Sequence, residues 1–211
     1  MKKYILCLAV LLGTFDVQTT FWANADQVES MDADSYKAFV EQTGNEIISV
    51  LVHKDEPMSE RKKAFRVILQ TKFSVPSIAK FVLARHWRGA SDAQKARYLS
   101  LFETAIVENY AAQFDNYANE KLEVTGAQPT GDGGFLVTSR ILRPSGAQPL
   151  QVDWKVYAQS KNADAAKKVV DIVVNGVSMS ITQRSEYASL LQQAGGNMDA
   201  FLDNLAKKYD A

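Results

Sequence analysis

The stretch VVDIVVNGVSMSITQRSEYASLLQQAGG, residues 169–196, joins a strand to a helix. Its first six residues are β-branched and apolar except for one aspartate, which predicts a buried strand. Val170, Ile172 and Val174 alternate along this strand and would form one wall of the interior. Asn175-Gly176 predicts a turn, and an amphipathic helix follows it. The end of the chain is therefore expected to fold back over a sheet.

Three segments upstream also predict strands. Residues 121–127 and 135–143 flank a glycine-rich turn, and residues 150–158 alternate strictly between apolar and polar side chains. A period of two is typical of a strand with one buried face. Short links between consecutive strands favour antiparallel pairing. We expect a mainly antiparallel sheet of about four strands.

Helices are predicted before and after these strands. Ser91-Asp92-Ala93-Gln94 matches a capping box. It would open the longest helix, which reaches about residue 117. Because the helices are grouped instead of alternating with strands, the fold class is α+β. The other predicted helices are residues 35–54, capped by Asp32 or Asp34, a helix capped by Ser59, residues 77–87, and two helices that contain residues 187–191 and 201–205.

The N-terminus predicts export. Lys2 and Lys3 precede an apolar run over residues 4–15, and Ala23-Asn24-Ala25 offers small residues where a signal peptidase reads them. A membrane anchor would need about 20 apolar residues, and Asp16 interrupts the run. We expect a signal peptide over residues 1–25. A single domain would then span 26–211, with a mainly helical part (26–117), a sheet (118–176) and C-terminal helices (177–211).

Charge and cysteine content exclude several classes of function. Residues 1–25 hold two of the 24 basic residues and one of the 24 acidic ones, so the mature chain would have a net charge of about −1. This balance predicts no broad attraction to nucleic acid or to anionic membranes. Cys7 is the only cysteine, and the bulky Leu6 before it argues against a lipoprotein signal. The mature chain would therefore have no disulfide and no cysteine nucleophile.

Catalytic motifs are weak in this chain. His53 and His86 are the only histidines, and neither lies in a cluster of metal-ligating residues, so we predict no metal site. Ser178 follows Gly176-Val177, but the second glycine of a nucleophile elbow is missing. Asp153 and Asp171 lie on predicted strands and would point away from the better apolar face. An enzyme that uses one of them as an acid or base stays a second alternative.

Apolar side chains are abundant on both the predicted sheet and the predicted helices. From periodicity alone, an ordinary filled core is the simpler interpretation. A cavity between the two layers is the other. The pattern itself does not separate these two, because it reports which side chains point inward and not how far apart the layers stand.

Several blocks in a fixed order resemble the family of periplasmic lipid carriers called MlaC, which includes toluene-tolerance auxiliary proteins and hopanoid-associated members. The resemblance covers nearly all of the predicted mature chain. One departure is the loop 162–167, where many members have a shorter Gly-Trp turn. The sequence blocks that carry the family resemblance are Phe81–Arg88, Ala90–Gln94, Phe102, Tyr110, Val152–Val156, Val170–Ile172 and Gly176–Ser178.

The resemblance implies a cone-shaped helix-and-sheet fold similar to nuclear transport factor 2, with an added helical subdomain. It implies a non-enzymatic, monomeric periplasmic carrier of phospholipid, or alternatively of a hopanoid or other isoprenoid lipid, with no cofactor besides this cargo. Its partners would be an inner-membrane ABC transporter with an MCE-domain protein and an outer-membrane lipoprotein complex. Arg85 and Arg88 would lie at the mouth beside the headgroup or at a docking face, or else on ordinary solvated surface. The expected tail-contacting residues are Ile78, Phe81, Val82, Phe102, Ile106, Tyr110, Val137, Val152, Trp154, Val156, Ile172 and Val174.

Overall fold

The computed structural model describes residues 18–112, 114, 120–144, 146–160 and 165–209. The chain divides into two units, residues 1–32 and 33–211. Most of the predicted signal peptide, residues 1–17, lies outside the described residues. The helices are α1 (Gln18–Val52), α2 (Met58–Lys72), α3 (Val75–Leu83), α4 (Arg85–Gly89), α5 (Asp92–Ala111), α6 (Met179–Gln193) and α7 (Met198–Tyr209); the strands are β1 (Lys121–Pro129), β2 (Gly134–Leu142), β3 (Leu150–Ala158), β4 (Lys167–Val174) and β5 (Val177–Ser178).

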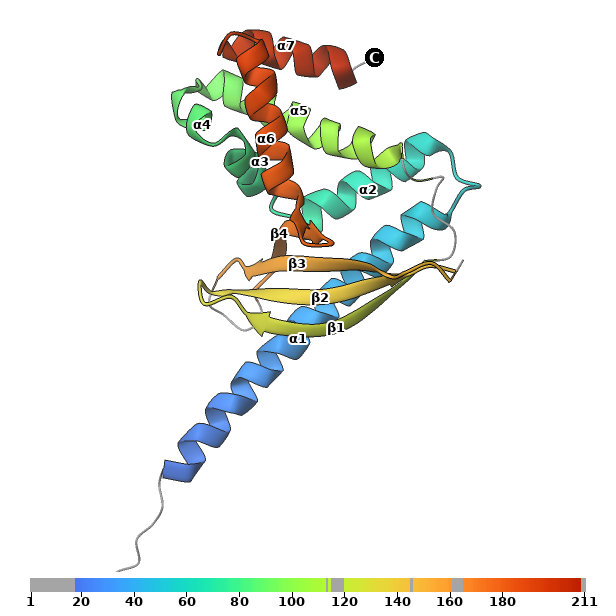
Figure 1. Cartoon of the computed structure of the whole chain (residues 1–211), viewed down its shortest axis with the longest axis vertical. Helices are drawn as coiled ribbons and strands as arrows, with labels where there is room; N and C mark the ends of the chain where they lie inside the picture. The colour runs from blue at the N-terminus through green and yellow to red at the C-terminus, as the bar shows by residue number, and fades with distance from the viewer. Residues whose placement is uncertain (1–17, 113, 115–119, 145, 161–164, 210–211) are drawn as a thin grey trace, which may run out of the picture. The chain divides into compact units, whose positions relative to one another are not determined.

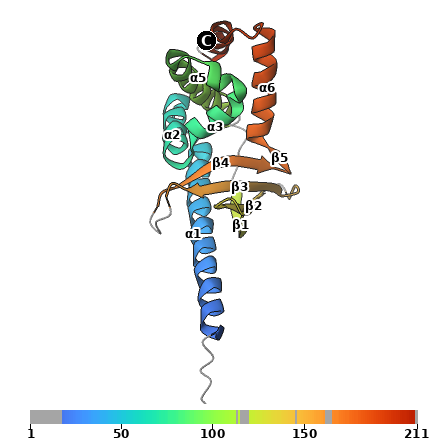
Figure 2. The ribbon, with the colours of Figure 1, turned by 90° about the vertical axis from the view of Figure 1, so that its left-hand side faces the viewer.

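The five strands form one antiparallel sheet in the order β1-β2-β3-β4-β5 (Figure 1; β5 is labelled in Figure 2). The predicted α+β class and the antiparallel pairing are confirmed. The fifth strand has only two residues and follows the predicted Asn175-Gly176 turn. A register shift in β4 pairs Val169 with Val156 and leaves Val170 as the extra residue. The bulge shifts the alternation of inward and outward side chains along β4 by one position. Val169, and not Val170, is therefore the fully buried residue opposite Val156.

Two apolar clusters stabilise the second unit. In the first, α2, α3, α5, α6 and α7 pack on one another, and we call these five helices the helical layer. In the second, the later turns of α1 pack against the inner face of β2, β3 and β4. The ring of Tyr36 on α1 stacks on Phe135 of β2 with centroids 4.2 Å apart. Gly44 lets the helix approach β1 closely, since a Cβ there would lie 2.3 Å from Cδ2 of Leu122.

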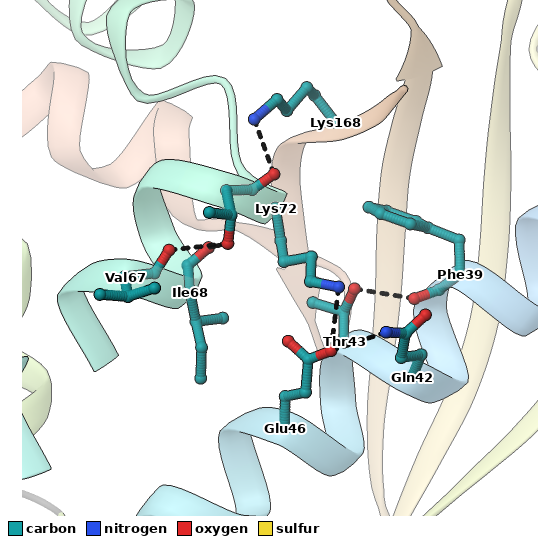
Figure 3. A network of polar contacts seen from close by, with 9 residues as sticks. Phe39, Gln42, Thr43, Glu46, Val67, Ile68, Lys72 and Lys168 are labelled. Carbon is teal, nitrogen blue, oxygen red and sulfur yellow. Dashed lines mark hydrogen bonds and ion pairs between the residues drawn. The ribbon is translucent and has the colours of Figure 1, made fainter. Parts of the chain in front are cut away.

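The end of α2 fixes the helical layer to the sheet (Figures 2 and 3). Lys168 of β4 donates from Nζ to the carbonyl oxygens of Gln70 (3.1 Å) and Thr71 (2.7 Å), which are near the C-terminus of α2. A cation there satisfies carbonyl groups that have no partner within the helix and opposes the negative end of its dipole. Lys72 forms an ion pair with Glu46 of α1 at 2.9 Å. The C-terminal end of α2 thus contacts β4 through Lys168 and α1 through the ion pair of Lys72 with Glu46.

The predicted helices are confirmed in part. The capping box of α5 is present, with Ser91 and Gln94 in reciprocal hydrogen bonds. The predicted end of this helix near residue 117 falls outside the described residues. Ser59 is not a cap, because α2 begins one residue earlier, after Pro57. Asp32 and Asp34 are not caps either, because α1 already begins at Gln18.

The predicted helix 77–87 is two helices. Ala84 separates α3 from α4 with φ 54° and ψ −127°. A residue other than glycine is strained at a positive φ, at a cost of about 1–3 kcal/mol. Nothing in the sequence around Ala84 indicates this break, since alanine is the best helix former.

Candidate functional site

A cavity of about 210 Å³ lies between the inner face of the sheet and the helices that cover it. Its lining comes from α1, α2, α3, α5, β2, β3, β4 and α6, so every layer of the second unit contributes. Only three lining residues are polar, and they lie together on β4 and the first turns of α6. The lining residues are Ile47, Leu51, Phe65, Leu69, Phe73, Ile78, Ile106, Tyr110, Phe114, Ile141, Leu150, Val152, Trp154, Val170, Asp171, Ile172, Val174, Met179, Ser180 and Gln183.

The sheet side of the cavity is held by a buried hydrogen-bond chain. Trp154 of β3 donates from Nε1 to Oγ of Ser139 at 2.9 Å, and Ser139 in turn donates to the carbonyl oxygen of Val152 at 2.6 Å. A buried indole N–H without a partner would cost free energy. Because Ser139 supplies that partner, the large face of Trp154 can form part of an apolar wall.

The far end of the wall is held by a buried cation. Arg61 of α2 is almost fully buried and donates from Nε to the carbonyl oxygen of Val50 (3.1 Å) and from Nη2 to that of Leu51 (2.7 Å). Its guanidinium also lies over the ring of Phe114 at 5.1 Å from the centroid. Arg61 therefore ties the C-terminus of α1 to α2 beside the lining residues Leu51 and Phe114.

The polar edge of the cavity is a helix start. Asp171 accepts hydrogen bonds from the hydroxyl of Ser178 (2.5 Å) and from the backbone N–H of Ser180 (3.0 Å). Ser178 accepts in turn from the N–H of Ile181 at 3.2 Å. Both carboxylate oxygens are thus engaged in fixing the N-terminus of α6 to β4. This arrangement gives Asp171 a structural role, and the cavity is not centred on its carboxylate.

Asp153 lies on the opposite face of β3 from Val152 and Trp154, as the alternation predicts. It is paired in register with Val173 and accepts hydrogen bonds from the side-chain amide of Gln151 at 3.1 and 3.3 Å. It does not border the cavity. Of the two aspartates, only Asp171 borders the cavity, so the expectation that it points away from the apolar side is wrong. Its carboxylate is held at the polar edge by Ser178 and Ser180.

The structure brings seven of the twelve expected tail-contacting residues to the cavity. Contact of these seven with a lipid stays a prediction. They are Ile78, Ile106, Tyr110, Val152, Trp154, Ile172 and Val174.

The other five expected residues lie elsewhere. Val137 and Val156 are fully buried against α1 and its neighbours. Phe102 and Val82 are buried within the helical layer. Phe81 is 42% exposed on α3, with Arg184 over its ring. The reason is that helical and strand periodicity place a residue on the inner side but do not tell which of several inner surfaces it meets.

Sequence reasoning missed most of the α1 and α2 wall. Phe65 and Leu69 stand four residues apart within one helix, as do Ile47 and Leu51, which is the spacing of an inward apolar stripe. The signal was therefore present, but it was indistinguishable from that of an ordinary core. Arg85 lies on a separate groove, and Arg88 is exposed on α4.

The described part of the chain lacks two other kinds of site. No group of three or more histidine, cysteine, aspartate or glutamate side chains is arranged to hold a metal ion there. Within the same ranges, no helix has the length and apolar character needed to span a bilayer.

The family model described as MlaC protein matches residues 41–207. The chain belongs to the MlaC family. The match begins in α1 and ends in α7, so it includes every element that lines the cavity.

Two relatives agree with this assignment. This MlaC-family chain is 22% identical over 200 residues to the intermembrane phospholipid transport system binding protein MlaC of Haemophilus influenzae, with 92% of this chain and 88% of the relative covered. Its fold matches that of the phospholipid-binding protein from Ralstonia solanacearum, solved in complex with a phospholipid, with a TM-score of 0.68 at 16% identity. That match covers 82% of this chain and 96% of the other.

Proposed function

We propose that this MlaC-family chain is a periplasmic carrier that holds the acyl tails of a phospholipid in the cavity. The observation that carries the proposal is the lining, which is apolar except for Asp171, Ser180 and Gln183 at one edge. A site of this kind suits a ligand with a long apolar part and a polar end. The phospholipid named for both relatives has that chemistry.

The free energy of hydrating a lipid tail makes such a shield necessary. Burial of each methylene is worth about 0.8 kcal/mol, so a tail of about 14 methylenes is disfavoured in water by roughly 11 kcal/mol. The polar headgroup carries no such penalty and can stay in solvent. We therefore expect the headgroup at the Asp171, Ser180 and Gln183 edge and the tails against β3, α2 and α5.

The volume of the cavity limits what fits without rearrangement. About 210 Å³ is below the range of roughly 300–1,000 Å³ that is typical of pockets for drug-sized ligands. We infer that binding of a whole diacyl lipid moves the helical layer and the sheet apart. The hydrogen bonds of Lys168 to the end of α2 would hold the two layers together at that point, while they separate elsewhere.

The proposal also includes export directed by residues 1–25. It further includes exchange of lipid with an inner-membrane transporter and an outer-membrane complex. The mature chain would cross the periplasm as a complex with its lipid. Docking would deliver the lipid to whichever partner has the higher affinity.

The test is native mass spectrometry of the protein purified from the periplasm of a Gram-negative host, followed by analysis of the extracted lipid. We expect a bound mass that corresponds to a phospholipid. A hopanoid mass would select the alternative cargo. Protein that arrives empty and binds no added phospholipid or hopanoid would contradict the proposal.

A matched pair of variants links the cargo to the cavity. Val174→Asn places an amide in the lining, whereas Val173→Asn makes the same change on the other face of β4. An amide that is buried without a partner costs about 1–3 kcal/mol, so lipid retention should fall at least about fivefold in the first variant only. Equal loss in both variants would indicate a general effect on the fold.

A further inference from the structure

One surface beside the cavity combines exposed apolar side chains with arginines. Val177 and Ile181 are 54% and 57% exposed, and Phe81 is 42% exposed on the neighbouring α3. The guanidinium of Arg184 lies over the Phe81 ring at 5.1 Å, so α3 and α6 meet at this point. We call Phe81, Val177, Ile181, Arg85 and Arg184 the mouth patch.

The mouth patch is interleaved with the polar edge of the cavity. Met179, Ser180 and Gln183 line the cavity, whereas Ile181 and Arg184 on the same two turns of α6 belong to the patch. At about 100° per residue, Arg184 projects next to Ser180, four residues before it, and Ile181 projects from the adjoining side of the same turns. A lipid that enters or leaves by the polar edge would therefore emerge beside the patch.

Local charge at the patch is strongly positive although the whole chain is nearly neutral. Residues 75–90 and 171–185 contain Lys80, Arg85, Arg88 and Arg184 against one acidic residue, Asp171, whose carboxylate accepts hydrogen bonds from the start of α6. Glu186 is two residues beyond Arg184, about 200° around the helix, and so projects from another side of α6. In the described ranges, no ion pair joins any of the three arginines to a carboxylate.

A groove of about 250 Å³ gives two of these arginines a common concave surface. Arg85 and His86 border it from α4, and Arg184 borders it from α6. Its floor is apolar and includes Tyr187 and Leu191. The strained backbone at Ala84 ends α3 just before Arg85, which brings the start of α4 to the groove.

We propose that the mouth patch docks on an anionic bilayer surface, with Phe81, Val177 and Ile181 among the acyl chains and Arg85 and Arg184 at the lipid phosphates. This inference rests on the proposed function, because it names the surface from which the cavity is filled or emptied. Aliphatic and aromatic tips flanked by unopposed arginines match the layering of a membrane interface, where apolar groups insert and cations meet phosphates. An acidic protein segment would satisfy the arginines but would leave the three apolar tips without a counterpart.

The test is co-flotation of the purified chain with vesicles of phosphatidylcholine alone or mixed with phosphatidylglycerol, at low and high ionic strength. We expect binding to the mixed vesicles at low ionic strength and its loss at high ionic strength. Arg85→Ser with Arg184→Ser should weaken that binding about 25-fold, since each basic residue near an anionic surface contributes about fivefold. Ile181→Ser should weaken it about tenfold, because one exposed aliphatic side chain is removed from the interface.

Matched controls separate the patch from general charge and hydrophobicity. Lys121→Ser with Lys207→Ser removes two exposed cations from β1 and α7, and Val67→Ser removes a side chain with the same 57% exposure from α2. Neither control should change vesicle binding by more than about twofold. Equal binding to both kinds of vesicle, no vesicle binding at all, or preferential binding of a polyglutamate peptide would overturn the inference.

The result is distinguishable from a failure of the proposed function. Lipid content is measured by native mass spectrometry on the same preparations. A wild-type protein that carries lipid but does not float with anionic vesicles contradicts only the docking inference. A protein that floats but never carries lipid contradicts the carrier proposal.

Discussion

The helical layer and the cavity beside it contain the same kinds of side chain, yet only one of them is filled. In the helical layer, Tyr98, Phe102, Tyr187 and Phe201 meet with ring centroids 5.7–6.4 Å apart, mostly edge to face or tilted. At the cavity, side chains from α2 and α5 face β3 and β4 across a space of about 210 Å³. Side chains of the same kinds thus close on one another in the helical layer and stand apart at the cavity. Apolar content alone therefore does not separate a core from a binding site.

The largest expected effect comes from truncation on the filled side. Phe102→Ala should destabilise the protein by about 3–5 kcal/mol, because it leaves a void among rings that cannot close. Ile172→Ala on the cavity side should cost less than about 2 kcal/mol, because its side chain already borders empty space. Urea denaturation monitored by circular dichroism measures both. Equal losses would mean that the cavity wall is packed as tightly as the helical layer.

The buried cation at the border of the two regions should have the next largest effect. Arg61→Met keeps an unbranched apolar stem but leaves the carbonyl oxygens of Val50 and Leu51 without this donor, so we expect a loss of about 2–3 kcal/mol. Arg66 is the control on the same helix. Arg66→Met breaks a partly exposed ion pair with Glu103 and should cost less than about 1 kcal/mol. If the two variants unfold at the same urea concentration, Arg61 is not a tie between α1 and α2.

Alkaline pH should weaken the filled side specifically. Burial raises the pKa of Tyr98 and of Tyr187 well above the ordinary tyrosine value. Below pH 10 the stabilisation from the neutral, buried hydroxyls is complete. Above pH 10 the unfolded chain releases these protons first, so stability falls by about 1.4 kcal/mol per pH unit for each tyrosine.

Tyr187→Phe checks this dependence. The fall in the free energy of unfolding between pH 10 and 11 should be smaller by about 1 kcal/mol in the variant, because the unfolded tyrosine is only partly ionised at pH 10. Tyr157→Phe, at the surface of β3, is the comparison. An unchanged slope in Tyr187→Phe would show that burial of this hydroxyl does not govern alkaline unfolding.

The smallest effect concerns the contact between α1 and β1. Gly44→Ala would bring a Cβ to 2.3 Å from Cδ2 of Leu122, and this side-chain end can move. We expect a net loss of less than about 1 kcal/mol, because the better helix propensity of alanine partly offsets the displacement. In Gly89→Ala the new Cβ meets nothing within 4 Å, so this variant should be neutral or slightly stabilised. Thermal denaturation of both variants measures the two effects.

Local patterns were sufficient for much of the fold. The Ser91–Gln94 capping box and the alternation along residues 150–158 depend on neighbours in sequence, and both are present as predicted. The break at Ala84 was missed, because a strained backbone is stabilised by distant packing and not by the residue itself. The cavity wall from α1 and α2 was missed for a related reason, since an inward stripe does not reveal its partner.

The sequence by itself determined the α+β class and the antiparallel sheet, because hydrophobic period, capping residues and short links act over a few positions. The family was indicated separately, by the resemblance of several sequence blocks that keep a fixed order, and the family model over residues 41–207 shows it. Only the tertiary structure decided which inward side chains fill space and which leave it open. That outcome depends on the separation and shape of the facing surfaces, set by contacts such as Arg61 with α1 and Lys168 with α2. The same holds for the mouth patch, where Phe81 and Arg184, which are more than 100 residues apart in sequence, meet in space.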